Sequence, residues 1–331
     1  MVIFYVAVTF IEFVLAGLYT KIALKKGIVD HPGERKMHEH SKPRGAGVSF
    51  FLVYAAAFLY LTRGHDFNFN YKLWLILGFV IFLVGFLDDI LNLPAGVKLI
   101  VQIAVAVIFT LYIGKATLFL KYKWLQMIIS VAWIIGIMNS FNLLDNMDGL
   151  SGGISLIVCL IFAFINFQLR NEIYLLYLLL AFIMAGFLPH NFYPSQCFMG
   201  DSGSLFIGFV ISTLSMIGVY TEFSLLKHLP VLIPVIVLSV PLYDTLSVIY
   251  IRIKNKKPIF VGDKNHFSHR LFDLGLSHKD SVLFIYLVTL STGIGSFLLL
   301  RVNWLGALVI LAQVLILFVL LSILIKTGRK K

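Results

Sequence analysis

The chain of 331 residues is 60% hydrophobic and only 13% charged, and its mean hydropathy is +0.94. A soluble domain of this length cannot bury that much apolar surface, so the composition excludes a soluble globular protein. The net charge of +11 is spread over short loops without a folded binding module, which excludes nucleic acid as a partner. Membrane topology, attraction to anionic lipids and an anionic substrate are all compatible with that charge.

The apolar residues gather in runs of about 20, the length that crosses a bilayer as a helix. We therefore expect an all-α integral membrane protein with about eleven transmembrane helices. The first run carries Glu12 and leads directly into further runs, which argues against a cleaved signal peptide. The expected spans are 1–24, 47–62, 72–87, 97–114, 124–144, 150–168, 172–189, 203–221, 228–251, 281–299 and 303–325.

The lysines and arginines fall mainly in every second gap between these runs. The positive-inside rule makes that side cytoplasmic, which places the N-terminus outside and the C-terminus in the cytoplasm. The gap around 115–123 fits this rule least well. We expect a single polytopic membrane domain over residues 1–331, with an active site on its cytoplasmic face. The loops expected to form that site are 25–46, 88–98, 145–150, 190–203 and 252–280.

Two adjacent acids, Asp88 and Asp89, close the third apolar run. A helix C-terminus is already negative and the two carboxylates repel each other, so a metal ion or a base such as Lys98 has to offset them. A solvated helix end is the simpler alternative. Because an acid pair directly after an apolar helix is costly when misplaced, we favour a functional site.

Polar side chains also end the fifth run, where Asn139, Asn142 and Asp145 recur at a spacing of three and Asp148 follows. This spacing places the first three on one helix face, which has to meet protein or water because lipid would leave it unsatisfied. Asp148 alternatively only caps the next span.

The segment 200–204, Gly-Asp-Ser-Gly-Ser, opens another apolar run and offers free N–H groups to an anion. It lacks the Gly-Lys-Ser/Thr ending of a Walker loop. Asp201 is therefore either a metal ligand or a helix N-cap.

His266 and His269 lie three residues apart in a basic loop, beside Arg270. No third ligand has a spacing typical of zinc, so phosphate binding suits this group better than metal binding. Incidental surface histidines are the alternative.

These motifs all fall on the expected cytoplasmic side. Acids for a divalent cation, basic groups for phosphates and a lipid-facing surface together indicate phosphoryl transfer to or from a membrane lipid. A transporter or flippase of an anionic lipid or solute, with the acids as a proton relay, is the alternative. It requires charges deep within spans, where only Glu12 is evident.

Several segments, in this order along the chain, also carry a family pattern: 30–38, 43–47, 85–89, 93–102, 139–150, 191–204, 241–245 and 263–271. Through them the chain resembles the polyprenyl-phosphate N-acetylhexosamine-1-phosphate transferases of the bacterial WecA/TagO type. The resemblance implies an enzyme of the bacterial inner (cytoplasmic) membrane that starts cell-envelope glycan synthesis. It implies transfer of a HexNAc-1-phosphate, with GlcNAc the favoured sugar, from UDP-N-acetylhexosamine to undecaprenyl phosphate, with release of UMP. The implied cofactor is Mg²⁺, with Mn²⁺ as a substitute, and the implied assembly is a homodimer within membrane lipids.

The resemblance also assigns roles by motif. Asp201 is expected as the main metal ligand with Asp89 as a helper, and Asp88 and Asp89 are expected to handle the lipid phosphate. The other implied site residues are Asn142, Asp145 and Asp148 at the nucleotide-sugar site, Asn191 and Phe198 at uracil, His266, His269 and Arg270 at the diphosphate, and Lys98 and Arg44 among the substrate contacts.

Two positions depart from the family pattern: Asn146 stands where glycine is usual, and Ser268 stands where the middle histidine is usual. The first keeps the turn feasible because asparagine tolerates a left-handed backbone; given the second, we rank His266 first. Two reaction routes remain open. Either the Asp88-Asp89 pair deprotonates the lipid phosphate, which then attacks directly, as we favour, or Asp145 forms a covalent intermediate.

Overall fold

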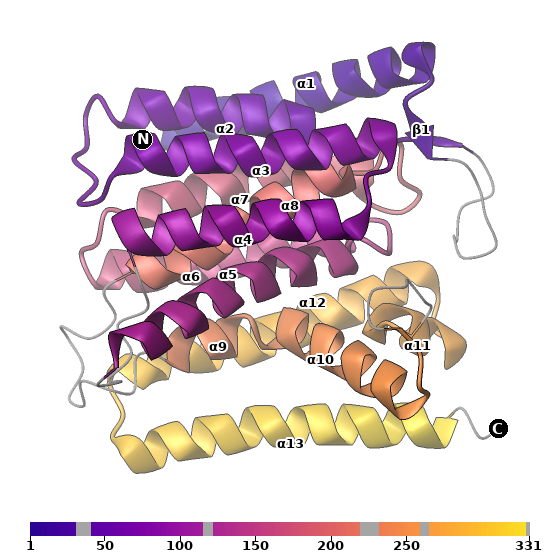
Figure 1. The fold of residues 1–331 in the computed structure, drawn as a ribbon. Coiled ribbons are helices and arrows are strands. Elements are labelled where there is room, and N and C mark those ends of the chain that lie inside the picture. Colours follow the sequence, from indigo (N-terminus) through magenta and orange to yellow (C-terminus); the bar gives the residue numbers. More distant parts are fainter. Residues whose placement is uncertain (31–40, 115–121, 219–231, 259–264, 329–331) are drawn as a thin grey trace. The chain divides into compact units, whose positions relative to one another are not determined.

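The computed structural model describes residues 1–30, 41–114, 122–218, 232–258 and 265–328 (Figure 1). Within them, nine helices are long and apolar enough to cross a membrane. This supports an all-α membrane protein. These helices are α1 (Val2–Lys26), α3 (Tyr71–Leu91), α4 (Ala95–Tyr112), α5 (Lys123–Leu144), α6 (Leu150–Gln168), α7 (Tyr174–Asn191), α8 (Gly200–Ile217), α12 (His278–Gly295) with its continuation η2 (Ser296–Leu300), and α13 (Trp304–Gly328).

The remaining helices are shorter: α2 (Gly47–Leu61), α9 (Leu232–Val237), α10 (Ser239–Lys254) and α11 (Phe267–Asp273). The expected span 47–62 corresponds to α2, which has 15 residues. Most of the expected span 228–251 corresponds to α9 and α10, and its first residues lie outside the described part of the chain. The one described sheet is a two-residue antiparallel pairing of β1 (Val29–Asp30) with β2 (Lys42–Pro43).

The helix ends follow recognisable sequence signals. Gly27 ends α1 in a left-handed conformation (φ 68°), and its N–H bonds back to the helix carbonyls. The Asn70 side chain accepts a bond from Leu73 N–H at the start of α3. Ser277 caps α12 in the same way through Asp280 N–H. Capping residues thus set where these apolar helices begin and end.

The chain forms two compact units, unit 1 (Met1–Gly218) and unit 2 (Val219–Lys331). In unit 1 the central helix is α8, which packs against α2, α3 and α5 and is buried along nearly its whole length. The closest approaches occur at glycines. A Cβ on Gly47 would lie 2.2 Å from Gly203 N, and one on Gly208 would lie 2.6 Å from Met138 Cα. Small residues at helix crossings are typical of membrane packing.

In unit 2, α9, α10 and α11 pack against α12. The Tyr243 ring of α10 stacks on Phe318 of α13 with centroids 4.4 Å apart, and its hydroxyl lies 2.8 Å from Ser322 Oγ.

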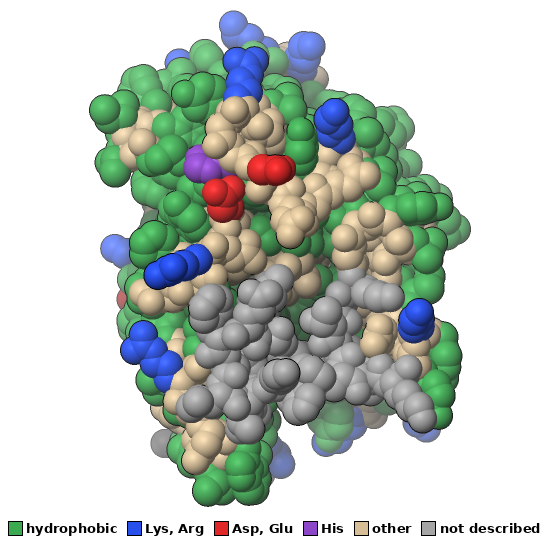
Figure 2. All heavy atoms as spheres, turned by 90° about the vertical axis from the view of Figure 1, so that its left-hand side faces the viewer, with side chains coloured by type: hydrophobic (Ala, Val, Ile, Leu, Met, Phe, Trp, Pro, Cys, Tyr) green, Lys and Arg blue, Asp and Glu red, His purple; other side chains and the backbone are tan. Residues whose placement is uncertain are grey.

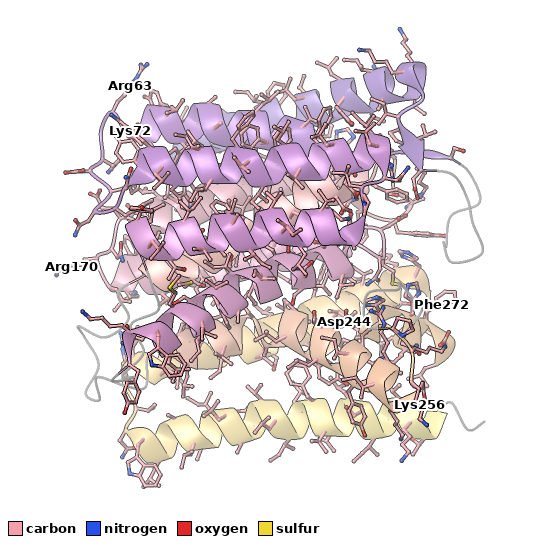
Figure 3. The ribbon with its side chains drawn as sticks, in the orientation of Figure 1. Arg63, Lys72, Arg170, Asp244, Lys256 and Phe272 are labelled. Carbon is pink, nitrogen blue, oxygen red and sulfur yellow. The ribbon has the colours of Figure 1, made fainter. Side chains whose placement is uncertain are left out.

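The end of unit 1 that holds the α2–α3 and α6–α7 loops has few acidic side chains among its hydrophobic ones (Figure 2). Across these loops, His65 Nδ1 lies 3.5 Å from Glu172 Oε1. Arg63, Lys72 and Arg170 lie at this end (Figure 3).

Candidate active site

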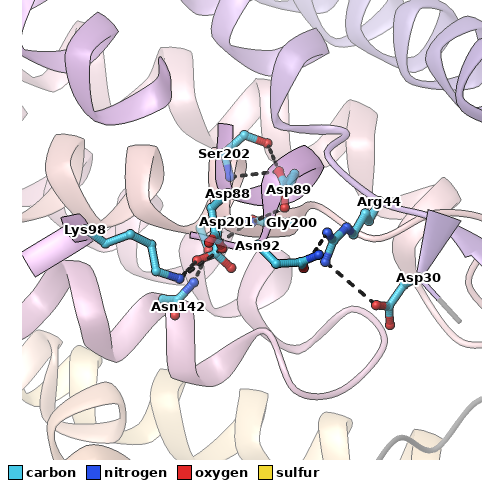
Figure 4. Close-up of polar contacts among 11 residues, drawn as sticks. Asp30, Arg44, Asp88, Asp89, Asn92, Lys98, Asn142, Gly200, Asp201 and Ser202 are labelled. Carbon is cyan, nitrogen blue, oxygen red and sulfur yellow. Dashed lines mark hydrogen bonds and ion pairs between the residues drawn. The ribbon is translucent and has the colours of Figure 1, made fainter. Parts of the chain in front are cut away.

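The best-defined polar cluster joins the end of α3 to the start of α8 (Figure 4). One Asp89 oxygen accepts the backbone N–H of Asp201 at 2.9 Å. The other accepts Ser202 N–H at 3.1 Å and Ser202 Oγ–H at 2.6 Å. The Asp89 carboxylate therefore caps α8 from a neighbouring helix, where the positive end of the helix dipole stabilises it.

Glycine is required where these two helix ends meet. Gly200 has φ +72°, and a Cβ there would lie 2.5 Å from both Asp89 oxygens. A Cβ on Gly85, one turn before Asp89, would lie 2.4 Å from the carbonyl oxygen of Asp201. The Gly-Phe-Leu-Asp-Asp and Gly-Asp-Ser segments thus fit each other only without side chains at these positions.

Asp88 and Asp201 contact the same lysine ammonium group. Lys98 Nζ, from the first turn of α4, lies 2.9 Å from Asp88 Oδ2 and 2.6 Å from Asp201 Oδ2. All three side chains are partly exposed. Asp88 and Asp201 therefore present two carboxylates toward the same point, and Lys98 offsets their repulsion.

Asp88 and Asp201 are the carboxylates available here for a magnesium ion. In the described ranges, no group of three or more His, Cys, Asp or Glu side chains is arranged to hold a metal ion. Magnesium, however, is usually bound by one or two carboxylates together with water and substrate phosphates. Asp88 and Asp201, which meet at one ammonium group, fit that pattern.

The end of α5 adds amide and acid groups. Asn142 donates to Ser204 Oγ of α8 at 3.0 Å, whereas Asn139 donates to Gln102 of α4 at 2.7 Å. The expected polar stripe thus meets two different helices. Asp145 follows α5 as its C-cap. Burial, and next the negative charges of Asp201 and Asp89, raise the pKa of the Asp145 carboxyl well above its usual range.

Asp148 belongs to a second group of contacts. Its Oδ2 accepts from Lys42 Nζ at 3.2 Å and from Ser195 N–H at 3.0 Å, and Lys42 also donates to Ser195 Oγ at 2.9 Å. The Lys42 ammonium lies 5.3 Å from the centroid of the Phe198 ring, a cation–π contact. The N-cap of α6 is Gly149, without a side-chain cap bond, so Asp148 contacts Lys42 and Ser195 and does not cap the next span.

Backbone bonds hold the surrounding loop in place. Phe198 N–H donates to the carbonyl of Pro43 at 2.8 Å, and Ala46 N–H donates to the carbonyl of Phe198 at 3.2 Å. The buried amide of Asn191 accepts from Gly149 N–H and donates to the carbonyl of Cys197. Asn191 thus connects the α5–α6 turn with the α7–α8 loop.

Arg44 lies apart from the Asp88 and Asp201 carboxylates. Its guanidinium donates to Asn92 Oδ1 at 2.9 Å and lies 3.9 Å from Asp30 Oδ1 (Figure 4). It therefore bridges β1 to the α3–α4 turn. Residues 31–40 of the expected loop 25–46, and residues 259–264 of the expected loop 252–280, lie outside the described residues.

The histidine group belongs to unit 2. His266 is the N-cap of α11, and its Nδ1 lies 2.9 Å from Asp244 Oδ2 of α10. Asp244 Oδ1 accepts Phe267 N–H at 2.6 Å. The rings of His266 and His269 lie with centroids 6.3 Å apart, and Arg270 donates to Ser247 Oγ at 2.6 Å.

Sequence reasoning missed five polar residues that contact the expected ones: Lys42, Ser195, Ser202, Asp244 and Ser247. The partners of Lys42 lie 106 and 153 residues away, so no local spacing reveals them. Asp244, Ser195 and Ser202 did have a signal, because they lie within the matching segments 241–245 and 191–204.

Comparison with known proteins gives this architecture a class. Residues 71–219 match the model of glycosyl transferase family 4. That region contains Asp88, Asp89, Lys98, Asp145 and Asp201.

Full-length relatives are more specific. The chain is 36% identical to a probable undecaprenyl-phosphate N-acetylglucosaminyl 1-phosphate transferase of Bacillus subtilis, over 90% of this chain and 84% of the relative. It is 32% identical to a decaprenyl-phosphate N-acetylglucosaminephosphotransferase of Mycobacterium tuberculosis, over 84% and 77%. A Thermotoga maritima relative named undecaprenyl-phosphate alpha-N-acetylglucosaminyl 1-phosphate transferase is 28% identical, over 84% and 91%. The chain belongs to the family of polyprenyl-phosphate N-acetylhexosamine-1-phosphate transferases.

Proposed function

We propose that this protein transfers GlcNAc-1-phosphate from UDP-GlcNAc to undecaprenyl phosphate and releases UMP. The relatives' names support this donor and acceptor class. The observation that carries the proposal is the convergence of Asp88 and Asp201 on Lys98 at the ends of apolar helices. This arrangement offers negative charge for a cation, and positive charge for phosphates, beside a lipid-facing surface. The acids lie at helix ends, where a transferase needs them. A proton-relay transporter needs charges deep within the spans instead.

In the proposed reaction, a phosphate oxygen of the lipid attacks the sugar-linked phosphorus of UDP-GlcNAc. The bond from that phosphorus to the bridging oxygen breaks, and UMP leaves with the electron pair. Asp88 accepts the remaining proton of the lipid phosphate. Asp201 would hold Mg²⁺ together with water and substrate phosphates, and the bound ion would neutralise phosphate charge, while Asp88 stays available as the base.

The other residues orient the donor. Phe198 offers a ring for uracil, Asn142 and Asp148 line the sugar-nucleotide site, and His266 and Arg270 contact the diphosphate. Asp89 positions Asp201 through the first turn of α8. Positioning of this kind supplies much of the rate in phosphoryl transfer, because the phosphates carry the chemistry themselves.

For the membrane arrangement, we propose eleven spans with the N-terminus outside and the C-terminus cytoplasmic, in the inner membrane. Nine candidate helices, the short helix α2 and the α9–α10 region support this count. The basic residues of the expected cytoplasmic gaps support the orientation.

The test is product formation by the purified full-length protein in detergent with UDP-GlcNAc, undecaprenyl phosphate and MgCl₂. We expect UMP release that depends on the lipid, and a lipid product whose mass rises by one GlcNAc-1-phosphate. EDTA should stop the reaction, and Mg²⁺ or Mn²⁺ should restore it. Lipid-independent UMP release, with a phosphosugar adduct on Asp145, would instead establish the two-step route.

A further inference from the structure

Two side chains of α10, one helical turn apart, contact His266 and Arg270, which are expected to bind the diphosphate. Asp244 is 1% exposed and bonds to both His266 Nδ1 and Phe267 N–H. Ser247 Oγ–H donates to the carbonyl of Asp244, which leaves its oxygen lone pairs to accept from Arg270 Nη2. Each α10 side chain thus fixes one functional group of α11.

The bond from Asp244 determines which nitrogen His266 presents. A carboxylate accepts hydrogen bonds, so Nδ1 of His266 carries the hydrogen and Nε2 is the ring nitrogen that Asp244 leaves available. The second Asp244 oxygen binds the first N–H of α11 at 2.6 Å, so the same carboxylate sets the position of the helix as well as the ring.

Arg270 is held on two sides. Its guanidinium carbon lies 5.7 Å from the Tyr243 ring centroid and 5.9 Å from that of Phe267. Ser247 binds one terminal nitrogen. The planar guanidinium is therefore oriented before any anion arrives, which lowers the entropy lost on binding.

We propose that Asp244 and Ser247 are positioning residues: Asp244 sets the tautomer and orientation of His266, and Ser247 sets the orientation of Arg270 toward the anionic donor. The inference rests on the proposed function, in which His266 and Arg270 contact the donor diphosphate. Asp244 and Ser247 act on different groups of α11. Substituting each one separately therefore tests its effect on His266 or on Arg270.

The experiment compares Asp244→Asn and Ser247→Ala in the full-length protein in detergent. Ser239→Ala is the matched control, because Ser239 lies on the same helix and its buried hydroxyl makes no hydrogen bond within the described residues. Histidine-selective ¹⁵N NMR reports the tautomer of His266, with His266→Gln to assign its signals. Initial rates over a range of UDP-GlcNAc concentrations separate kcat from the donor KM, and melting temperatures report folding.

We expect Asp244→Asn to shift His266 toward the Nε2–H form, because the amide NH₂ donates to Nδ1, and to lower kcat by about 100-fold. Ser247→Ala should raise the donor KM by about tenfold with kcat within about threefold of wild type, as for a lost bond to a charged group.

An unchanged His266 spectrum in a folded Asp244→Asn variant, or a Ser247→Ala variant whose donor KM equals that of Ser239→Ala, would overturn the inference. If Asp244→Asn does not fold, the Ser247→Ala kinetics decide. If the wild type makes no lipid-linked product, the proposed function fails, whereas the NMR comparison still tests Asp244.

Discussion

Adjacent residues in this site have different surroundings and therefore different roles. Asp89 is buried and accepts three hydrogen bonds from the first turn of α8. Asp88 is more exposed and contacts Lys98, which also binds Asp201. We therefore propose to divide the role expected of the pair: Asp89 holds the first turn of α8, and Asp88 acts on the lipid phosphate.

Asp201→Asn should lower turnover by at least about 100-fold, because a neutral amide cannot hold the cation that offsets the donor diphosphate. The measurement is UMP release at saturating MgCl₂. Asp66→Asn, in the exposed α2–α3 loop, is the matched control and should retain wild-type turnover. Near-normal activity of Asp201→Asn would show that the ligand assignment is wrong.

Lys98→Met should bind Mn²⁺ more tightly than the wild type in the absence of substrate, by about tenfold, because the ammonium no longer competes for Asp88 and Asp201. Electron paramagnetic resonance of free Mn²⁺ measures this affinity. Lys42→Met is the control, since the Lys42 ammonium binds Asp148 instead. Equal Mn²⁺ affinities in the two variants would mean that Lys98 does not occupy the cation position.

Phe198→Ala should weaken donor binding more than chemistry. A base stacked on an aromatic ring contributes about 1–3 kcal/mol, so the donor KM should rise by about 5- to 150-fold with a smaller fall in kcat. Phe198→Tyr keeps the ring and should stay close to wild type. A collapse of kcat at constant KM would indicate a packing role for the ring.

At the scale of elements, the α3–α8 crossing positions the acids. Gly85→Ala inserts a Cβ into the carbonyl group of Asp201, which should displace the first turn of α8. Overpacking of this kind costs about 1–3 kcal/mol, so both the melting temperature and UMP release should fall.

Gly136→Ala is the control for this prediction, because nothing lies within 4 Å of its added Cβ. Replacing a glycine by alanine at a helix position with free space around it leaves the stability unchanged or raises it. Wild-type turnover in Gly85→Ala would show that the α3–α8 contact does not position Asp201.

The sequence predicts where the helices lie along the chain more closely than it predicts which side chains contact one another. Hydropathy places the expected spans 124–144 and 150–168 within a residue of α5 and α6, because apolar length is a local property. It ends the third span at 87, whereas α3 continues to Leu91 and contains both acids. Hydropathy counts an aspartate as an interruption, but inside the fold the N–H groups of α8 satisfy Asp89. Contacts such as Lys42 with Asp148 need the packed fold, so composition and spacing do not reveal them.

At the scale of the whole molecule, the proposed orientation predicts which ends of unit 1 face the outside. A cysteine replacing Arg63 should react with a membrane-impermeant thiol reagent on intact cells, and one replacing Lys26 should react only after permeabilisation. Arg63 lies at the α2–α3 end of unit 1 (Figure 3). The unmodified protein is the control, because Cys159 and Cys197 are both buried. The reverse labelling pattern would contradict the proposed orientation.

The short helix α2 affects how a membrane lipid can reach a water-soluble sugar nucleotide. Its 15 residues rise roughly 22 Å, less than the roughly 30 Å of a bilayer's hydrocarbon core. The helix begins at Gly47, packed against Gly203 in the first turn of α8 beside Asp201. Thinning of the surrounding bilayer is one response to a helix this short. We expect the protein to lower the polar surface to the phosphate of a long-chain lipid, so that the hydrocarbon chain stays in the bilayer during the reaction.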